Sequence, residues 1–267
     1  MKKLICSDID GTLLNAERDL SSKTISVIDE LKNKVPVVLI SARMPSAMRH
    51  LQKQLGIQNQ PFVAYNGGLI SVNNVTKQST TISFELVKKI VKSNTHDLHL
   101  SLYHNDDWIA PQLDQWTKRE INNTKINPTI KSNEDVLKLW ERNNNGAHKI
   151  MCMGDAKLVS EFYDELAKKL TEDLHLYRSK DTYIEIAPKQ ISKKSAIEFL
   201  IASEFGLHLS DVLSFGDNYN DIEMLQASGH GVAVGNAKKE VKLAADEIIG
   251  NAKEDGVAEF LLAYFKM

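Results

Sequence analysis

The 267-residue sequence has few of the features that mark secreted or membrane proteins. Its two cysteines, Cys6 and Cys152, cannot form the disulfide framework of a small secreted domain, and the apolar residues around each indicate packing rather than a bridge. No apolar stretch reaches the roughly 20 residues that a membrane span needs. The apolar run after the basic start Met1-Lys2-Lys3 is too short for a signal peptide. We therefore expect a cytoplasmic protein without a membrane partner.

An excess of charge of one sign is also missing. The chain has 33 basic and 35 acidic residues, a net charge of −2, and no long run of either sign. Nucleic acids are bound through basic clusters, so we expect no nucleic-acid partner. The composition, with 42% hydrophobic and 25% charged residues, is that of an ordinary globular protein and argues against disorder. It does not indicate an oligomeric state.

Short apolar runs alternate with helical patterns at both ends of the chain. This β-α-β rhythm predicts a parallel sheet with helices on its faces. Before residue 81 it predicts strands at Lys3–Ser7, Val35–Ile40 and Pro61–Tyr65 and helices at Ser22–Lys32 and Pro45–Leu55. After Pro188 it predicts helices at Lys193–Phe205, Asp221–Ala227, Lys238–Ala245 and Gly256–Tyr264 and strands at Asp211–Phe215, Gly231–Val234 and Glu247–Ile249.

The middle of the chain has a different pattern, in which apolar and polar residues alternate along the strands. Such alternation predicts an antiparallel sheet with helices on one face and water on the other. The expected strands are Leu98–His104, Asp107–Ala110, His148–Met153, Leu174–Arg178 and Thr182–Ala187, and the expected helices are Phe84–Ser93, Gln112–Asn122, Asn133–Arg142 and Ala156–Leu170. The predicted fold is a doubly wound α/β core, residues 1–80 and 188–267, with an α+β domain inserted at 81–187.

An acidic motif, Asp8-Ile9-Asp10-Gly11-Thr12-Leu13-Leu14, follows the first predicted strand directly. Ligands of an open parallel sheet bind beyond the carboxyl ends of its strands. Asp8 and Asp10 are two residues apart, so both can face one site in an extended chain. A surface turn is the alternative interpretation, because Asp and Gly favour turns.

Two further strand ends and one helix start carry similar chemistry. The strand at Val35–Ile40 runs into Ser41-Ala42-Arg43, and that at Asp211–Phe215 runs into Gly216-Asp217-Asn218-Tyr219-Asn220-Asp221. A predicted helix opens with Ser192-Lys193-Lys194. The carboxylates, hydroxyl and lysine of these segments favour a catalytic site over a turn.

This constellation resembles the haloacid dehalogenase superfamily, and within it the Cof-type phosphatases with a large inserted C2B-type cap. The resemblance covers essentially the whole chain and is carried by DIDGTLL and GDNYNDIEML. It implies that Asp8 is the nucleophile and Asp10 the general acid/base. It further implies that Ser41, Ala42, Arg43, Asn66, Lys193 and Asn220 bind phosphate or substrate, and that Asp8, Asp10 (through its backbone carbonyl), Asp217 and Asp221 form or support the metal site.

The family usually has Lys-Gly at its third motif, whereas this chain has Lys193-Lys194, so that both lysines stay candidates for the phosphate-binding role. Arg43 has two equally compatible roles, contact with substrate or pairing with a core carboxylate. Asn66 precedes Gly67, and Asn-Gly is also a common turn. The eight scattered histidines show no paired metal-ligand spacing, and His99–Tyr103 predicts a strand face in water.

Electrostatics independently predicts a cation. Two unit charges about 4 Å apart repel by roughly 4 kcal/mol at an effective dielectric constant near 20. Several carboxylates and a phosphate dianion would gather at one site, and one lysine does not offset their repulsion. Oxygen ligands without cysteine or histidine favour Mg²⁺ over zinc.

The sequence thus predicts an Mg²⁺-dependent phosphatase that works through an aspartyl-phosphate. The resemblance makes sugar phosphates the first choice of substrate, followed by cofactors such as flavin mononucleotide and pyridoxal phosphate. A phosphotransferase or mutase on the same fold is the first alternative. A non-catalytic sensor of phosphorylated ligands is the second, although the presence of Asp8 and Asp10 argues against it.

Overall fold

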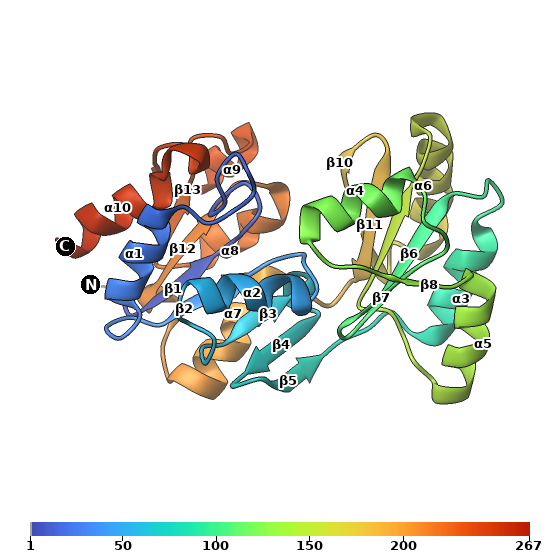
Figure 1. Ribbon diagram of the computed structural model, residues 1–267, viewed down its shortest axis with the longest axis horizontal. Coiled ribbons are helices and arrows are strands. Elements are labelled where there is room, and N and C mark those ends of the chain that lie inside the picture. The colour runs from blue at the N-terminus through green and yellow to red at the C-terminus, as the bar shows by residue number, and fades with distance from the viewer. Residues whose placement is uncertain (1) are drawn as a thin grey trace. The chain divides into compact units, whose positions relative to one another are not determined.

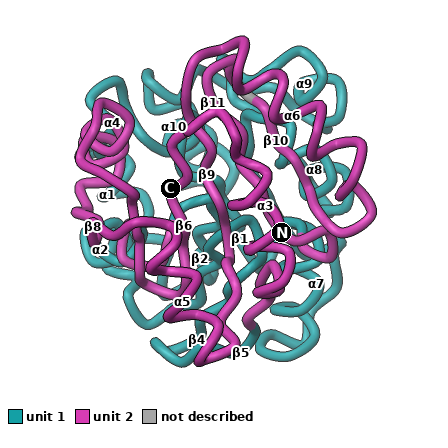
Figure 2. The backbone as a smooth tube through the Cα atoms, turned by 90° about the vertical axis from the view of Figure 1, so that its right-hand side faces the viewer, with its two compact units in different colours: residues 1–43, 48–78, 192–267 teal, residues 44–47, 79–191 magenta. Residues whose placement is uncertain are grey.

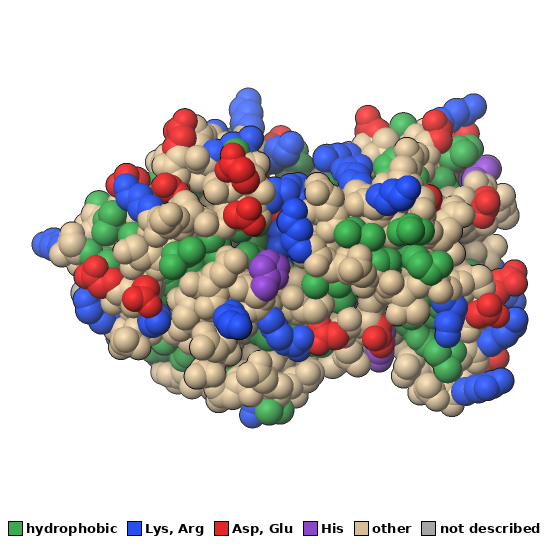
Figure 3. Space-filling model, in the orientation of Figure 1, with side chains coloured by type: hydrophobic (Ala, Val, Ile, Leu, Met, Phe, Trp, Pro, Cys, Tyr) green, Lys and Arg blue, Asp and Glu red, His purple; other side chains and the backbone are tan. Residues whose placement is uncertain are grey.

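The computed structural model describes residues 2–267. They form two compact units, residues 2–43, 48–78 and 192–267 in the first and residues 44–47 and 79–191 in the second (Figure 2). Each unit is built around a sheet of its own (Figure 1). Lys and Arg side chains are interspersed with Asp and Glu side chains over the visible face of each unit (Figure 3). Among the described residues, no helix is both long and apolar enough to cross a membrane.

The first unit contains an eight-stranded sheet in the order β14-β13-β12-β1-β2-β3-β4-β5. All neighbouring pairs from β14 to β3 are parallel, which confirms the doubly wound α/β class. The chain moves outward from β1 in both directions, so the strand order reverses between β1 and β12, where such folds bind ligands. The strands are β1 (Leu4–Ser7), β2 (Val37–Ile40), β3 (Phe62–Ala64), β4 (Leu69–Val72), β5 (Val75–Ser79), β12 (Val212–Gly216), β13 (His230–Ala233) and β14 (Glu247–Ile248).

The strands β4 and β5 were not predicted. β4 pairs antiparallel with β3 and is buried, whereas the residues of β5 are mostly exposed. Between them, Asn73 and Asn74 both have a positive φ, at 51° and 62°. Two successive left-handed residues are typical of tight hairpin turns, and asparagine tolerates this conformation well.

Helices precede or follow the parallel strands of the first unit. They are α1 (Ser22–Leu31), α2 (Ser46–Gln54), α7 (Lys193–Leu200), α8 (Ile222–Ala227), α9 (Lys239–Ala244) and α10 (Gly256–Phe265). The side chain of Ser21 accepts the Thr24 amide and thereby caps the start of α1. The single helix predicted from Lys193 to Phe205 is divided: α7 continues as a wider π-helical turn that Gly206 ends in a left-handed conformation.

The second unit contains a six-stranded sheet in the order β10-β11-β9-β6-β7-β8. Its pairs are antiparallel except that β7 and β8 run parallel. The strands are β6 (His99–His104), β7 (Asp107–Ala110), β8 (Thr129–Ile130), β9 (Lys149–Met153), β10 (Leu174–Lys180) and β11 (Tyr183–Pro188), and the helices are α3 (Phe84–Ser93), α4 (Gln115–Thr124), α5 (Asn133–Asn143) and α6 (Ala156–Leu170).

One face of this sheet packs against α3, α5 and α6. Apolar residues of those helices and of the alternate strand positions form a single core, which includes Ile90, Trp140, Phe162, Leu100 and Ile184. Burial of these side chains is the main source of the unit's stability.

The other face of β6 was predicted to lie in water, and that prediction is wrong. His99, Ser101 and Tyr103 are all buried. His99 contacts Asp114, which caps α4, and it also contacts Ser101, so a polar network rather than water satisfies the imidazole of His99 and the hydroxyl of Ser101. The alternation correctly predicted which side chains of β6 share one face, but it did not predict that this face is buried.

Both cysteines are buried free thiols, as predicted. Burial raises the pKa of the Cys152 thiol to about 12, and it raises the pKa of Cys6 as well. Neither thiol is therefore a reactive thiolate at neutral pH.

Candidate active site

The carboxyl ends of β1 and β12 lie side by side at the point where the strand order reverses. Ser7 pairs with Phe215, and the Asp8 amide donates to the Phe215 carbonyl at 3.0 Å. Asp8 leaves β1 beside the residue that precedes Gly216 and Asp217. Because the two strands are parallel, both carboxylates emerge at the same edge of the sheet, as the sequence predicted.

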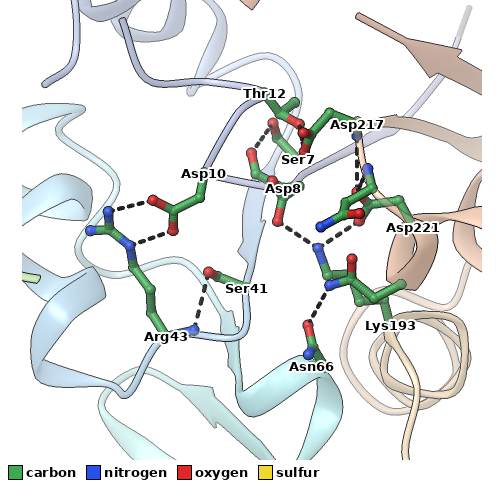
Figure 4. Close-up of polar contacts among 12 residues, drawn as sticks. Ser7, Asp8, Asp10, Thr12, Ser41, Arg43, Asn66, Lys193, Asp217 and Asp221 are labelled. Carbon is green, nitrogen blue, oxygen red and sulfur yellow. Dashed lines mark hydrogen bonds and ion pairs between the residues drawn. The ribbon is translucent and has the colours of Figure 1, made fainter. Parts of the chain in front are cut away.

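Lys193 lies between two of these carboxylates. Its Nζ is 2.5 Å from Oδ1 of Asp8 and 2.6 Å from Oδ1 of Asp221 (Figure 4). Burial acts to lower the pKa of Lys193, but the charges of Asp221 and Asp8 outweigh it and raise the pKa, so the ammonium form persists. Lys194 instead forms an exposed pair with Glu198 at 2.7 Å. The geometry therefore favours Lys193 as the lysine of the site.

The start of α7, which carries Lys193, is fixed by its surroundings. The Ser192 side chain accepts the Ser195 amide, and the Ser195 side chain accepts the Ser192 amide, which forms a capping box. Gly67 approaches this helix start so closely that a Cβ atom there would lie 2.6 Å from the Ser192 carbonyl oxygen. Only glycine fits that position, because its φ is also +113°.

Asp221 is fully buried, and both its oxygens already have partners. Oδ2 accepts the amides of Asp217 and Asn218, at 2.9 and 3.0 Å, while Oδ1 binds Lys193. These contacts hold the loop after β12 and orient the lysine. Because both oxygens are already occupied, these contacts indicate that Asp221 supports the site rather than binds a metal directly.

The loop after β2 and the turn after β3 are joined by backbone hydrogen bonds. The Asn66 amide donates to the Ser41 carbonyl at 2.8 Å, and the Tyr65 amide donates to the Arg43 carbonyl at 3.1 Å. Tyr65 and Asn66 both have positive φ values, 55° and 56°, so this turn holds two non-glycine residues in a sparsely populated conformation. Ala42 lies half-buried between Ser41 and Arg43 in the first of these loops.

Asn220 reaches the same turn from the loop after β12. Its Nδ2 donates to Oδ1 of Asn66 at 2.9 Å, and Asn66 is buried. The hydroxyl of Ser41, also buried, accepts the Arg43 amide at 3.2 Å. The structure thus brings Ser41 and Asn66 to the edge of the sheet that carries Asp8 (Figure 4), and the hydrogen bond to Asn66 brings Asn220 there as well.

Asp10 does not join the carboxylate cluster through its side chain. Its carboxylate points to Arg43 (Figure 4), which binds it with Nε and Nη2 at 2.7 and 2.8 Å. Partial burial acts to raise the pKa of Asp10, but the hydrogen bonds and charge of Arg43 outweigh it and lower the pKa. Of the two roles open to Arg43 from the sequence, pairing with a core carboxylate is the one that these contacts show.

The remaining carboxylates are crowded enough to favour a cation. Asp8, Asp217 and Asp221 each offer an oxygen within 4.8 Å of the others. Burial raises the pKa of Asp8 well above its usual range; Lys193 acts against this rise, and Asp221 and Asp217 add to it. Burial and the charge of Asp221 raise the pKa of Asp217 to about 6. A divalent cation with oxygen ligands would relieve this repulsion, so the donor set fits Mg²⁺.

Two residues beside this cluster were not among the predicted site residues. The Thr12 hydroxyl donates to Oδ1 of Asp217 at 3.2 Å, and Nδ2 of Asn236 donates to the Gly11 carbonyl at 2.7 Å. Thr12 belongs to the acidic motif itself. Asn236 lies three residues after the last residue of β13, Ala233, and this place after a buried strand was the available signal.

Comparisons with known proteins agree with this geometry. The family model of the haloacid dehalogenase-like hydrolases matches residues 5–261. A Haemophilus influenzae protein whose name gives a provisional phosphatase assignment is 35% identical over 98% of this chain and 97% of its own. The 5-amino-6-(5-phospho-D-ribitylamino)uracil phosphatase YcsE of Bacillus subtilis is 30% identical over 96% of this chain and 93% of its own.

A solved structure shares the fold over the full length. The haloacid dehalogenase-like hydrolase from Bacteroides thetaiotaomicron is 28% identical, with a TM-score of 0.89 over 99% of this chain and 100% of that one. The family model matches nearly the whole chain, and the relatives match over their full length, so the family of this chain is established. The chain belongs to the haloacid dehalogenase-like hydrolases and is a phosphoric monoester hydrolase.

Proposed function

We propose that this phosphatase hydrolyses small phosphorylated metabolites, sugar phosphates first among them, with Mg²⁺ and through an aspartyl-phosphate on Asp8. The observation that carries the proposal is the contact of Lys193 with Asp8 and Asp221 at the switch point of the sheet. It places a buried nucleophilic carboxylate next to a fixed positive charge.

Asp8 and Asp217 would hold the metal together with the backbone carbonyl of Asp10, and Asp221 would support them. When bound, Mg²⁺ supplies positive charge that lets a carboxylate approach an anionic phosphoryl group. Lys193 supplies a second positive charge for the phosphoryl oxygens. Ser41, Ala42, Arg43, Asn66 and Asn220 line the same edge of the sheet and are proposed to orient the phosphoryl group or the substrate.

The reaction has two steps. A carboxylate oxygen of Asp8 attacks phosphorus, the bond from phosphorus to the ester oxygen breaks, and Asp10 gives its proton to the departing alcohol. Water then attacks phosphorus, Asp10 accepts a proton from the water, and the Asp8 carboxylate is released together with inorganic phosphate. The anionic state of Asp10, which Arg43 favours, is the state needed for the second step, whereas the first step uses the protonated form of Asp10.

The proposed substrate class has support from a relative. The Bacillus subtilis protein YcsE is named for a substrate that carries its phosphate on a ribityl chain. Phosphate esters of sugars and polyols have small alcohol leaving groups, which need the proton that Asp10 would supply.

Residues 81–187 are proposed to act as a cap that selects the leaving group. All of the proposed catalytic, phosphate-binding and metal-binding residues lie outside this span, in residues 1–80 and 188–267, the proposed catalytic core. The span has a sheet and core of its own. Such a unit is suited to substrate discrimination rather than to the chemistry itself.

The experiment that tests the proposal measures phosphate release from a panel of phosphorylated metabolites by the wild-type protein and by Asp8→Asn. We expect turnover with Mg²⁺, none with chelator, and none for Asp8→Asn. Acid-quenched wild-type protein should carry a phosphoryl group that hydroxylamine removes, as an acyl phosphate does. The matched control is Asp19→Asn in an exposed loop, which should keep full activity. Normal turnover by a folded Asp8→Asn variant would exclude the covalent route.

A further inference from the structure

The loop at residues 234–238, which follows β13, is attached to the loop that carries Asp217. The Val234 amide donates to the Gly216 carbonyl at 3.3 Å, and the Lys238 amide donates to the Asp217 carbonyl at 2.9 Å. The middle of this loop is therefore held beside the acidic cluster from both of its ends.

Asn236, in the middle of this loop, makes two hydrogen bonds with one side-chain amide. Nδ2 donates to the Gly11 carbonyl at 2.7 Å, and Oδ1 accepts the Ala252 amide at 2.8 Å. A carboxamide nitrogen only donates and its oxygen only accepts, so these two partners fix the orientation of the group. The side chain thus links the turn after β1 to the loop at residues 234–238.

The turn at Gly11 packs closely against the carboxylate of Asp217. Gly11 has a φ of +86°, and a Cβ atom on it would lie 2.4 Å from Oδ2 of Asp217. The next residue, Thr12, donates its hydroxyl to Oδ1 of the same carboxylate at 3.2 Å. Both carboxylate oxygens therefore lie against this turn, and a rotation of the peptide after Gly11 would move the Thr12 hydroxyl away from Asp217.

We propose that Asn236 is a positioning residue that holds the turn at Asp10–Thr12 against Asp217 and thereby sets the affinity of the site for Mg²⁺. This inference rests on the proposed function. Asn236 touches the Gly11 carbonyl, which belongs to the turn, and none of the carboxylates of the cluster. It acts by fixing the direction of the Gly11–Thr12 peptide, and with it the Asp10 carbonyl and the Asp217 carboxylate.

The test measures Mg²⁺ binding to the substrate-free protein by isothermal titration and thermal unfolding in chelator. Asn236→Ala removes both hydrogen bonds, of which the one to the Gly11 carbonyl is the one that fixes the turn. We expect the dissociation constant for Mg²⁺ to rise by roughly 3- to 10-fold, the range for the loss of that one hydrogen bond. Asn236→Asp keeps the acceptor for Ala252 and loses the donor to Gly11. It should unfold in chelator at nearly the wild-type temperature and still bind Mg²⁺ more weakly.

The second variant separates positioning from charge. An added carboxylate near a cation site favours Mg²⁺, so weaker binding by Asn236→Asp has to come from the lost donor. Asn59→Asp, at an exposed position before β3 and thus at the opposite edge of the sheet, is the matched control and should bind like the wild type.

A folded Asn236→Ala variant with the wild-type dissociation constant overturns the inference. If Asn236→Ala does not fold, Asn236→Ser decides, because it adds no charge and is too short to reach the Gly11 carbonyl, and binding as tight as in the wild type has the same meaning. Failure of the proposed function gives a different result, because the wild-type protein itself would then bind no Mg²⁺ in the titration.

Discussion

Arg43 binds Asp10 through two nearly parallel hydrogen bonds, from Nε to Oδ2 at 2.7 Å and from Nη2 to Oδ1 at 2.8 Å. Such bidentate pairs are among the stronger polar interactions in proteins. The pair keeps the proposed acid/base in its anionic form, because the Arg43 charge outweighs the partial burial that would raise the pKa of Asp10. Arg43 therefore controls the proton affinity of the group that has to activate water.

Replacement of Arg43 should move the pH profile of turnover. In Arg43→Gln the largest opposition to burial is lost and only the smaller effects of Arg18 and Lys193 remain, so the pKa of Asp10 rises. As the pH falls, the base form of Asp10 is then lost at a higher pH than in the wild type. With p-nitrophenyl phosphate, whose leaving group needs no proton, and saturating Mg²⁺, the acidic limb of kcat should shift to higher pH. Arg43→Lys keeps the charge and should shift it less.

The control for this profile is Arg142→Gln, an exposed arginine in α5. Its acidic limb should coincide with that of the wild type. An unchanged limb in both Arg43 variants would show that Asp10 does not act as the base.

Lys193 and Lys194 form a matched pair for a second prediction. Lys193→Met leaves the buried carboxylates Asp8 and Asp221 without their cation, which should lower the free energy of unfolding by about 3 to 5 kcal/mol and eliminate turnover. Lys194→Met removes only an exposed pair with Glu198 and should change stability by less than about 1 kcal/mol. Urea unfolding and phosphate release measure both.

The loss in Lys193→Met should also depend on pH. The pKa of Asp8 is already raised, and without the lysine it rises further, so acid neutralises the uncompensated charge. The difference in unfolding free energy from the wild type should therefore shrink between pH 8 and pH 5. A difference that grows toward acid would contradict the buried ion pairs assigned here.

Asp217 should lower the stability of the metal-free protein. Its pKa rises from 3.8 to about 6 on folding, so the folded state resists ionisation that the unfolded chain accepts freely. This penalty is fully present above pH 6 and disappears as the pH falls toward 3.8. Asp217→Asn should thus raise the free energy of unfolding at pH 7.5 in chelator by about 1 to 2 kcal/mol.

The same variant should lose its advantage in Mg²⁺. The wild-type protein gains stability from the bound cation. Asp217→Asn lacks one ligand of that cation, so it should neither bind Mg²⁺ nor hydrolyse substrate. Thermal unfolding with and without Mg²⁺ provides the comparison. If Asp217→Asn were less stable than the wild type in chelator at pH 7.5, repulsion in the cluster would not be the dominant effect.

The fold was predictable where burial and periodicity agree. α3 and α6 have the predicted limits, because each carries a full period-3.6 pattern of apolar residues. β7 also has the predicted limits, although its residues from Trp108 to Ala110 are buried in succession rather than in alternation. The hairpin of β4 and β5 was missed because most of the β5 side chains are polar and exposed. The pair Asn73-Asn74 was the only local sign of it, and it depends on backbone conformation rather than on hydrophobicity.

The site was predictable to the extent that it lies at strand ends. Asp8 and Asp217 each follow a buried strand, and a parallel sheet brings such residues to one edge. The contacts of Thr12 with Asp217 and of Asn236 with Gly11 join residues 205 and 225 positions apart. No local sequence pattern predicts contacts between residues so far apart in the chain. For the same reason, the sequence did not predict that the Asp10 side chain points to Arg43.

The last prediction concerns the proposed cap. Replacing residues 81–187 by a Gly/Ser linker should leave Asp8, Lys193 and Asp217 in place, since every contact described among them lies within the first unit. If the cap selects the leaving group, the shortened protein should lose most of its preference among natural phosphate esters. Its hydrolysis of p-nitrophenyl phosphate should fall less, because that ester needs little help beyond phosphoryl binding and the nucleophile. Phosphate release across the same panel of metabolites gives the ranking, and Asp8→Asn in the shortened protein controls for contaminating phosphatases. A folded, shortened protein that ranks natural substrates as the full chain does would remove the cap from substrate selection.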